Sequence, residues 1–499
     1  MTGELRDGVE LPRAQQGIRI PRQPSPGVNL VGFLEAESGL GEFARRLAHA
    51  LGSTDIPVAA IPYRGTHARR EHALPFAAAE EAAYDVNLLS LSADDLVKFA
   101  AVAGVELFAN RYSIGVWFWE TNILRDEDRA ATRYLDELWV ASDYVRSAIA
   151  PVVDIPVRVI PVPVEAPADP VRERAGLGLP DGFMFLFVFD FWSGPRKNPV
   201  AVVEAFKRAF APGEGPVLVL KSINGRDWKP RQLEHLILLS DGRDDIVLRD
   251  GYVSSAERDE YLATCDCYVS LHRSEGLGLT MAEAMALGKP VIATGYSGNL
   301  EFMNEANSYL VPYELVDVPT DWWAYEPGAT WAEPDVDAAA TLMRHAWERP
   351  AEALAVGERG RAELLERFSP ERTARFVAGR LAELRAQGAI AARASENDAR
   401  PAILEVSQDL AKEPGAALAN GRRAPTSLVR RFLRRALWPY LEEERRADRA
   451  VLDAVTSLQR SIQDLERRVL QLEGIIAPGT VCSSQAGRHH ASASPEDEA

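Results

Sequence analysis

Two glutamates and two glycines stand close together in the segment SLHRSEGLGLTMAEAMALGKPVIATG, which covers residues 270–295. Glu275 and Glu283 flank seven residues, and Gly276 and Gly278 between them allow the backbone to approach a ligand closely. The helix that we expect from about Thr280 presents its first N–H groups as an anion site. Glu283, one turn into that helix, can accept two hydrogen bonds from a vicinal diol such as a ribose. The segment therefore predicts a site that holds an anion and a diol side by side.

A second interpretation explains part of this pattern without a ligand. Thr280 and Glu283 have the spacing of a capping box, in which a hydroxyl and a carboxylate satisfy the first free N–H groups of a helix. This local role accounts for Glu283. It accounts for neither Glu275 nor the two glycines, so both interpretations stay open from the sequence.

Two adjacent cations precede another predicted helix, in FDFWSGPRKNPVAVVEAFKRAF, residues 189–210. Arg196 and Lys197 stand directly before Asn198, a good N-cap, and Pro199, a good first helical residue. Cations there oppose the helix macrodipole, which favours negative charge by about 0.3 to 1 kcal/mol. The pair therefore predicts an anion between the two side chains, and two solvated surface charges are the alternative.

Short apolar runs, each followed by a helical or turn-rich stretch, must position these residues. Their alternation predicts βαβ units around parallel sheets, and the proline-rich stretch PVPVEAPADP, residues 161–170, divides them into two sets. We predict an α/β protein with two facing, Rossmann-like, doubly wound domains, residues 1–165 and 166–385, with ligands in the turns after the strands. The predicted strands are Val28–Leu34, Ile56–Ile61, Asp85–Leu91, Ser113–Trp119, Glu137–Ala141, Val157–Val162, Phe183–Phe189, Val217–Lys221, Ile246–Leu248, Cys267–Leu271, Pro290–Thr294 and Ser308–Val311.

The last part of the chain predicts a helical extension. Ser369 and Pro370 open a closing helix over residues 368–384, after a long tryptophan-rich loop at 318–337, and residues 386–426 read as a flexible linker. Within 427–476, residues 427–441 form an amphipathic helix with an arginine face, and 451–476 repeat apolar residues at coiled-coil spacing. We predict a homo-oligomer through the coiled coil and a disordered tail at 477–499. The arginine face suits an anionic membrane surface or a partner helix.

Composition restricts the function classes. The 499 residues carry a formal net charge of −17, which argues against general nucleic-acid binding. No run of apolar residues is long enough for a membrane span, and the first thirty residues lack the apolar region of a secretory signal. The three cysteines, Cys265, Cys267 and Cys482, have no zinc spacing. We expect a cytoplasmic protein without a structural metal, and the arginine-rich helix predicts peripheral contact with the inner face of the cytoplasmic membrane.

The glutamate segment, its trailing Gly-Lys-Pro-Val and the upstream RKNP turn together resemble the retaining glycosyltransferases of the GT-B fold, family 4. The resemblance covers roughly residues 28–384. It implies a nucleotide-sugar donor bound mainly by the C-terminal domain, with the acceptor on the N-terminal domain. The family pattern has an arginine several residues before the lysine, where this chain has Phe191-Trp192-Ser193, and Arg196 is the candidate for the missing charge.

The same resemblance implies roles for individual residues. Glu283 would hold the ribose hydroxyls, Glu275 would act near the donor sugar, and Lys197 would neutralise the diphosphate. Tyr252 would lie near the base. The backbone that would meet the diphosphate and the sugar belongs to Gly276, Leu277, Gly278, Leu279 and Thr280.

Two N-terminal segments complete the predicted site. Gly39 and Gly41, in EAESGLGEFARRLAHAL, match the glycine loop that the family brings against the donor phosphates, although a tight turn explains them equally well. Trp117, Trp119 and Glu120, in GVWFWETN, stand where the family often has a histidine. They suit stacking on the acceptor sugar and a polar or basic group beside it, or else the tryptophans pack the interior.

The function implied is transfer of a hexose from a nucleotide sugar to a glycan or lipid-linked saccharide in cell-surface polysaccharide biosynthesis. The resemblance implies retention without a covalent enzyme intermediate. No cofactor is expected, and because no Asp-x-Asp triplet stands in a plausible donor loop, we expect no metal. The alternatives are a nucleotide-sugar epimerase of the same fold and a catalytically silent scaffold.

Overall fold

A computed structural model describes residues 18–66, 68–72, 74, 76–166, 174, 176–319 and 325–395. The predicted amphipathic helix at 427–441, the coiled coil at 451–476, the tail at 477–499 and most of the linker lie outside these residues.

The N-terminal domain is built on a six-stranded parallel sheet with the order β2-β1-β3-β4-β5-β6. Serines cap three of its helices, since Ser38, Ser92 and Ser142 each accept a hydrogen bond from a backbone N–H in the first turn. The strands are β1 (Ser25–Gly32), β2 (Val58–Pro62), β3 (Tyr84–Ser90), β4 (Tyr112–Trp117), β5 (Glu137–Val140) and β6 (Val157–Val159), and the helices are α1 (Gly39–Gly52), α2 (Ala93–Ala103), α3 (Asp126–Ala130) and α4 (Asp143–Ile149).

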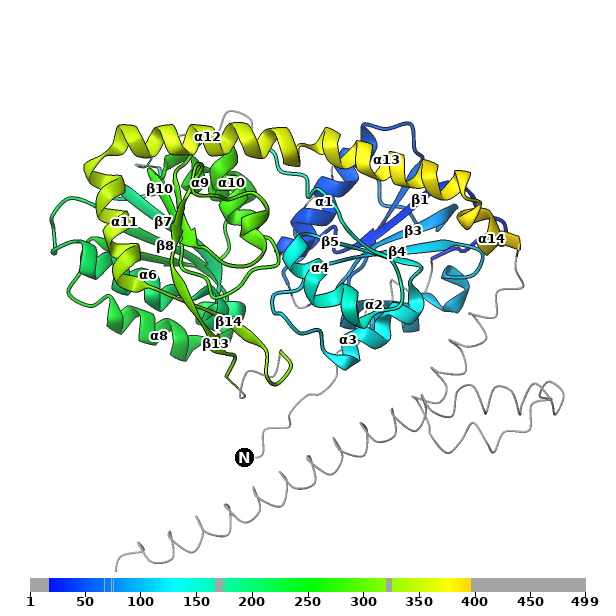
Figure 1. Cartoon of the computed structure of the whole chain (residues 1–499), viewed down its shortest axis with the longest axis horizontal. Coiled ribbons are helices and arrows are strands. Elements are labelled where there is room, and N and C mark those ends of the chain that lie inside the picture. The colour runs from blue at the N-terminus through cyan, green and yellow to red at the C-terminus, as the bar shows by residue number, and fades with distance from the viewer. Residues whose placement is uncertain are drawn as a thin grey trace, which may run out of the picture. The chain divides into compact units, whose positions relative to one another are not determined.

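The C-terminal domain repeats this plan with the order β12-β11-β10-β7-β8-β9, again parallel. Figure 1 shows both sheets with helices on their faces. The strands are β7 (Met184–Asp190), β8 (Val217–Ile223), β9 (Ile246–Asp250), β10 (Cys267–Ser270), β11 (Val291–Thr294) and β12 (Tyr309–Val311). The helices are α5 (Gly194–Lys197), α6 (Pro199–Ala209), α7 (Gly225–Trp228), α8 (Pro230–Leu239), α9 (Ser255–Thr264), α10 (Leu279–Ala286), α11 (Val336–Glu348) and α12 (Pro350–Phe368). Short 3₁₀ helices lie at Val105–Leu107, Ala131–Tyr134, Ala150–Val152, Phe191–Ser193 and Gly298–Glu301.

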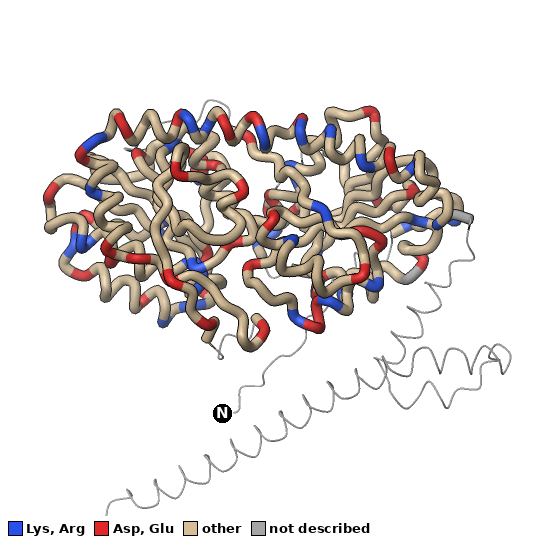
Figure 2. Tube along the Cα trace, viewed as in Figure 1, with Lys and Arg blue, Asp and Glu red and all other residues tan. Residues whose placement is uncertain are grey.

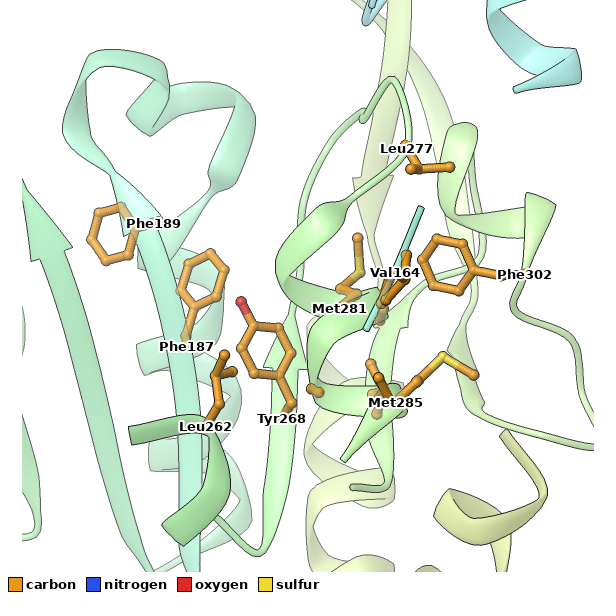
Figure 3. Packing of buried hydrophobic residues seen from close by; sticks show 14 of the residues in the cluster. Val164, Phe187, Phe189, Leu262, Tyr268, Leu277, Met281, Met285 and Phe302 are labelled. Carbon is orange, nitrogen blue, oxygen red and sulfur yellow. The ribbon is translucent and has the colours of Figure 1, made fainter. Parts of the chain in front are cut away.

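All the strands predicted from the sequence are confirmed, with boundaries shifted by a few residues. The C-terminal core forms where the apolar faces of β7, β10 and α10 meet. Figure 3 shows Phe187 of β7, Tyr268 of β10, and Met281 and Met285 of α10 gathered in this core. Burying such side chains is worth about 1.5 to 3 kcal/mol each, which explains why the apolar runs predicted the strands well.

The predicted loop at 318–337 contains part of a two-stranded antiparallel hairpin, β13 (Tyr313–Asp317) and β14 (Thr330–Pro334). The long connection between the strands lacks the two-residue turn by which hairpins are recognised in sequences. Trp331 and Ala332 are buried, and the Ala332 N–H donates to the Arg273 carbonyl oxygen at 2.9 Å. The hairpin is therefore attached to the turn that follows β10.

The predicted closing helix is α13 (Pro370–Ala386), with Ser369 as its N-cap. Figure 1 shows α12 lying along the C-terminal domain and α13 along the N-terminal domain. Arg380 of α13 donates to the buried Glu137 of β5 at 2.7 Å, and Arg385 donates to Asp85 at 2.7 Å. The C-terminal domain thus ends near residue 368, and α13 belongs to the N-terminal body.

A further helix, α14 (Ala389–Ser395), follows within the first part of the predicted linker. The side chain of Ile390 is buried against the N-terminal domain, and this apolar contact stabilises the short helix. Within the part of the chain that the structure describes, no helix is both long and apolar enough to cross a membrane.

Candidate functional site

A cavity of about 1010 Å³ lies between the two domains. Its walls come from segments that follow β1, β2, β3 and β4 in the N-terminal sheet and, in the C-terminal sheet, from the ends of β7 and β8 and the segments that follow β7, β9 and β10. Strand order reverses between β1 and β3 and between β7 and β10, and parallel sheets bind ligands at such switch points. The cavity is therefore where the fold itself predicts a ligand.

Glu275 is a buried carboxylate of the cavity that pairs with two cations. It follows β10, is 6% exposed, and its two oxygens meet two cations, Lys197 Nζ at 2.5 Å and Arg196 Nη1 at 3.0 Å. Its backbone N–H donates to Ser297 Oγ at 2.8 Å. Burial by itself raises the pKa of Glu275, but Arg196 and Lys197 outweigh it and lower this pKa to about 2. Glu275 is thus a fixed negative charge at neutral pH.

The structure confirms the predicted cap of α6 and shows which anion lies between Arg196 and Lys197. Asn198 does cap α6, with Pro199 as the first helical residue. The anion between Arg196 and Lys197 is Glu275, which the sequence did not reveal as their partner. Arg196 is 7% exposed and also donates to the Ser274 carbonyl oxygen at 2.7 Å, so it is not a solvated surface charge. Lys197 lines the cavity and keeps N–H donors for a ligand.

The local structure around Glu283 excludes the capping box. Helix α10 begins at Leu279, its N-cap is Gly278 in a left-handed conformation with φ +94°, and glycine has no side chain that could accept the first N–H groups. Glu283 is 3% exposed, and its Oε1 receives a hydrogen bond from Arg46 of α1, while Arg258 Nη2 of α9 lies 3.7 Å away. Both arginines were missed because they lie far from Glu283 in the sequence.

The glycine turn between the two glutamates presses against the N-terminal domain. A Cβ on Gly276 would lie 3.0 Å from the Trp119 carbonyl oxygen, and Ser142 Oγ donates to the Gly276 carbonyl oxygen at 2.8 Å. The cavity wall at this point comprises Gly276, Leu277, Gly278, Leu279 and Thr280, as the sequence placed them. What they bind stays a prediction.

Gly39 and Gly41 have different surroundings. Gly39 lines the cavity at the start of α1, and a Cβ there would meet no atom within 4 Å. A Cβ on Gly41 would lie 2.2 Å from the Ala36 carbonyl oxygen, and among the described residues Gly41 is not part of the cavity wall. The prediction of ligand contact is therefore corrected for Gly41, which is a packing glycine.

The tryptophan prediction is also corrected in part. Trp117 is 2% exposed and packs in the N-terminal core, so it cannot stack on a sugar. Trp119 is half-buried, donates its Nε1–H to the Ile123 carbonyl oxygen at 2.8 Å, and lies edge-on to Tyr325. Neither belongs to the cavity wall as far as the chain is described, whereas Phe118 does. Alternation along β4 could not reveal which face is buried.

Glu120 lines the cavity, with Oε1 3.6 Å from Arg196 Nη2. Glu120 and Glu275 thus share one buried guanidinium. The arrangement brings two carboxylates and two cations together in the cavity wall.

Tyr252 lies at another part of the wall, where its hydroxyl donates to Asn224 Oδ1 at 3.1 Å. The guanidinium carbon of Arg69, from the N-terminal domain, is 4.8 Å from the centre of the Tyr252 ring. Trp192, at the place of the family arginine, lines the cavity and is 50% exposed, with Lys229 Nζ 4.8 Å from its ring centre. This part of the cavity therefore offers aromatic faces with cations above them.

Charges of both signs are interspersed over the two domains, as Figure 2 shows. The cavity wall also carries both signs, with six lysine and arginine side chains, Arg45, Arg69, Arg196, Lys197, Lys221 and Arg258, beside eight aspartates and glutamates. Among the described residues no group of three or more His, Cys, Asp and Glu side chains could hold a metal ion.

Comparison with known proteins identifies a matching sequence family and a shared fold. Residues 182–319 match the family described as Glycosyl transferases group 1. A D-inositol 3-phosphate glycosyltransferase from Xylanimonas cellulosilytica is 32% identical over 165 residues, 33% of this chain and 38% of that protein. The enzyme of the same name from Arthrobacter sp. is 30% identical over 198 residues, 38% of this chain and 45% of that protein. The match thus spans less than half the length of these curated relatives.

Solved structures resemble a larger part of the chain. HepE from Anabaena, crystallised with UDP and glucose, superposes with a TM-score of 0.52 at 16% identity, over 72% of this chain and 100% of HepE. Sucrose-phosphate synthase from Thermosynechococcus elongatus gives a TM-score of 0.52 at 18% identity, with the same coverage. Both likenesses concern the fold, since identity is low. The chain has the GT-B fold, and its residues 182–319 match the family of glycosyl transferases group 1.

Proposed function

We propose that the protein transfers a hexose from a nucleotide sugar to a hydroxyl group of a saccharide. One observation carries the proposal. At the switch point of the C-terminal sheet, the buried Glu283 and the Lys197–Glu275 ion pair line the same cavity. The matched family, the curated relatives named as glycosyltransferases and the fold shared with a UDP complex support it.

The donor fits the cavity by chemistry. A ribose diol can donate to the Glu283 carboxylate, and the diphosphate can meet the first N–H groups of α10 and the ammonium of Lys197. The base would lie toward Tyr252 and Trp192, whose rings are exposed to the cavity. These contacts use no metal, because helix N–H groups and a lysine offset the diphosphate charge.

The proposed transfer retains the configuration of the sugar. The bond between the anomeric carbon and the diphosphate oxygen breaks, the acceptor oxygen bonds to the same face, and the acceptor proton passes to the departing diphosphate. Glu275 is held ionised, so it stabilises positive charge on the sugar rather than donating a proton. Glu120 is the candidate to orient the acceptor hydroxyl. A Glu120→Gln variant with unchanged turnover would exclude this role.

The acceptor and location are proposed from the chain as a whole. We propose a glycan or lipid-linked saccharide of a cell-surface polysaccharide, a cytoplasmic enzyme that oligomerises through 451–476, and peripheral membrane contact through 427–441. Flotation of the full-length protein with vesicles rich in anionic lipid tests the contact. Replacing Arg430, Arg431, Arg434 and Arg435 by alanine should abolish flotation, and parent protein that never floats contradicts it.

Thermal unfolding with UDP, GDP, ADP and dTDP tests the donor site. A ligand at about one hundred times its Kd stabilises the native state by roughly 2.7 kcal/mol. We expect one nucleotide to raise the Tm, and Glu283→Gln to reduce the rise because glutamine weakens the bond to the ribose. If none of the four nucleotides raises the Tm of the parent protein, the proposed donor site is wrong and the result favours a catalytically silent scaffold.

A further inference from the structure

Arg46 of the N-terminal domain reaches across the cleft to a carboxylate of the other domain. It lies on α1, and its Nη2 donates to Oε1 of Glu283 on α10. Its Nε donates to Oε1 of Glu42 at 2.8 Å, and Glu42 in turn accepts from Arg45 at 2.8 Å. Arg46 keeps only 12% of its side-chain exposure. A buried chain of alternating charges therefore links the start of α1 to Glu283.

Both arginines that contact Glu283 contact the same oxygen. Arg258 Nη2 lies 3.7 Å from Oε1, the atom that Arg46 also binds. Among the hydrogen bonds of the described residues none goes to Oε2, and Glu283 forms part of the cavity wall. An ionised carboxylate has about four acceptor positions. Glu283 is thus anchored through one oxygen and has the other to offer to a ligand.

The charge of Glu283 needs compensation if an anion binds nearby. A nucleoside diphosphate carries several negative charges, and a buried carboxylate without a counterion would repel it through a medium of low dielectric. Arg46 and Arg258 supply positive charge directly at Glu283, one from each domain. Burial opposes the charge on Arg46, but Glu283 and Glu42 outweigh it and raise the pKa of the guanidinium.

We propose that Arg46 is a positioning residue of the donor site, contributed by the opposite domain. It fixes Oε1 of Glu283 and compensates its charge, so that Oε2 can accept from a ribose hydroxyl beside an anionic diphosphate. This inference rests on the proposed function. It also means that the donor site is complete only when α1 and α10 face each other as they do in this structure.

Isothermal titration calorimetry of the full-length protein tests this role. The probes are UDP, GDP, ADP and dTDP, followed by the neutral nucleoside of the base that binds best. We expect Arg46→Gln to weaken binding of the nucleoside diphosphate by about tenfold or more, because a hydrogen bond to a charged group is lost. Binding of the nucleoside should weaken by a smaller factor, since it carries no charge for Glu283 to repel. Arg46→Lys keeps the charge and should restore most of the affinity.

A double-mutant cycle separates action through Glu283 from any independent effect. If Arg46 acts through Glu283, the Arg46→Gln, Glu283→Gln double variant binds no more weakly than Glu283→Gln alone. Arg129→Gln, an exposed arginine of the same domain, is the matched control and should bind as the parent does. Additive losses, or an Arg46→Gln variant with parental affinity while Glu283→Gln is weakened, would overturn the inference and leave the proposed function intact. A parent protein that binds no nucleotide overturns both.

Discussion

At the scale of single residues, the cleft depends on carboxylates that are buried yet ionised. Burial raises the pKa of Glu275 and of Glu42, but the arginines and the lysine beside them outweigh it, and both pKa values fall to about 2. Their ordinary value is 4.5. Because the folded-state pKa is lowered, each carboxylate stabilises the folded protein above pH 4.5, and this contribution is lost as the pH falls toward 2.

The free energy of unfolding should therefore decrease between pH 4.5 and pH 2. Each group contributes a slope of up to about 1.4 kcal/mol per pH unit. Urea unfolding at pH 7, 5, 4 and 3.5 measures it, with Glu275→Gln as the variant that no longer titrates at this position. The variant should show a shallower decrease than the parent. Equal slopes in the two proteins would contradict the ionised state of Glu275.

Among the elements, the start of α1 carries two glycines with different surroundings. Gly41 packs against the backbone, and Gly39 faces the cavity. We expect Gly41→Ala to lower the free energy of unfolding by about 1 to 3 kcal/mol or more, because its Cβ would lie 2.2 Å from a backbone oxygen. Gly39→Ala should leave stability unchanged or slightly higher, since its Cβ meets no atom. Urea unfolding compares the two variants, and equal losses would refute this distinction.

The elements also show what a sequence can predict. Apolar runs located the strands of both sheets because buried parallel strands need continuous apolar residues. Lys197 and Glu275 lie in the segments that follow β7 and β10, where the sequence placed them, and their binding of a ligand stays a prediction. The sequence could not join Arg46 to Glu283, 237 positions apart, since only the approach of the domains creates that contact. Nor could it show that Trp117 points into the core.

At the scale of the whole molecule, the chain passes between the domains at two neighbouring places. The Val164 N–H donates to the Phe368 carbonyl oxygen at 2.7 Å, and Thr373 Oγ1 donates to the Pro161 carbonyl oxygen at 2.7 Å. Beyond this double crossing, α13 packs on the N-terminal domain through the buried pair of Arg380 and Glu137. The last helices therefore stabilise the first domain.

Arg380→Ala should destabilise the protein by about 3 kcal/mol, because it leaves a buried carboxylate without one of its counterions. The loss lies at the lower end of the range for such pairs, since Arg158 Nε stays 3.0 Å from Glu137. Chemical unfolding measures it. Arg375→Ala, at an exposed position of the same helix, is the control and should cost little. Similar losses for the two variants would argue against docking of α13 through this pair.

Proton NMR of a nucleotide sugar incubated with the purified protein, with and without a saccharide acceptor, tests for glycosyl transfer. The nucleotide sugar should carry the base that binds best in the calorimetry and thermal unfolding experiments. We expect nucleoside diphosphate to accumulate, and to accumulate faster when an acceptor is present. The transferred or released sugar should first have the anomeric configuration that it had in the donor. Conversion of the donor into a second nucleotide sugar would identify an epimerase. A donor that binds and stays unchanged under all conditions would contradict glycosyl transfer.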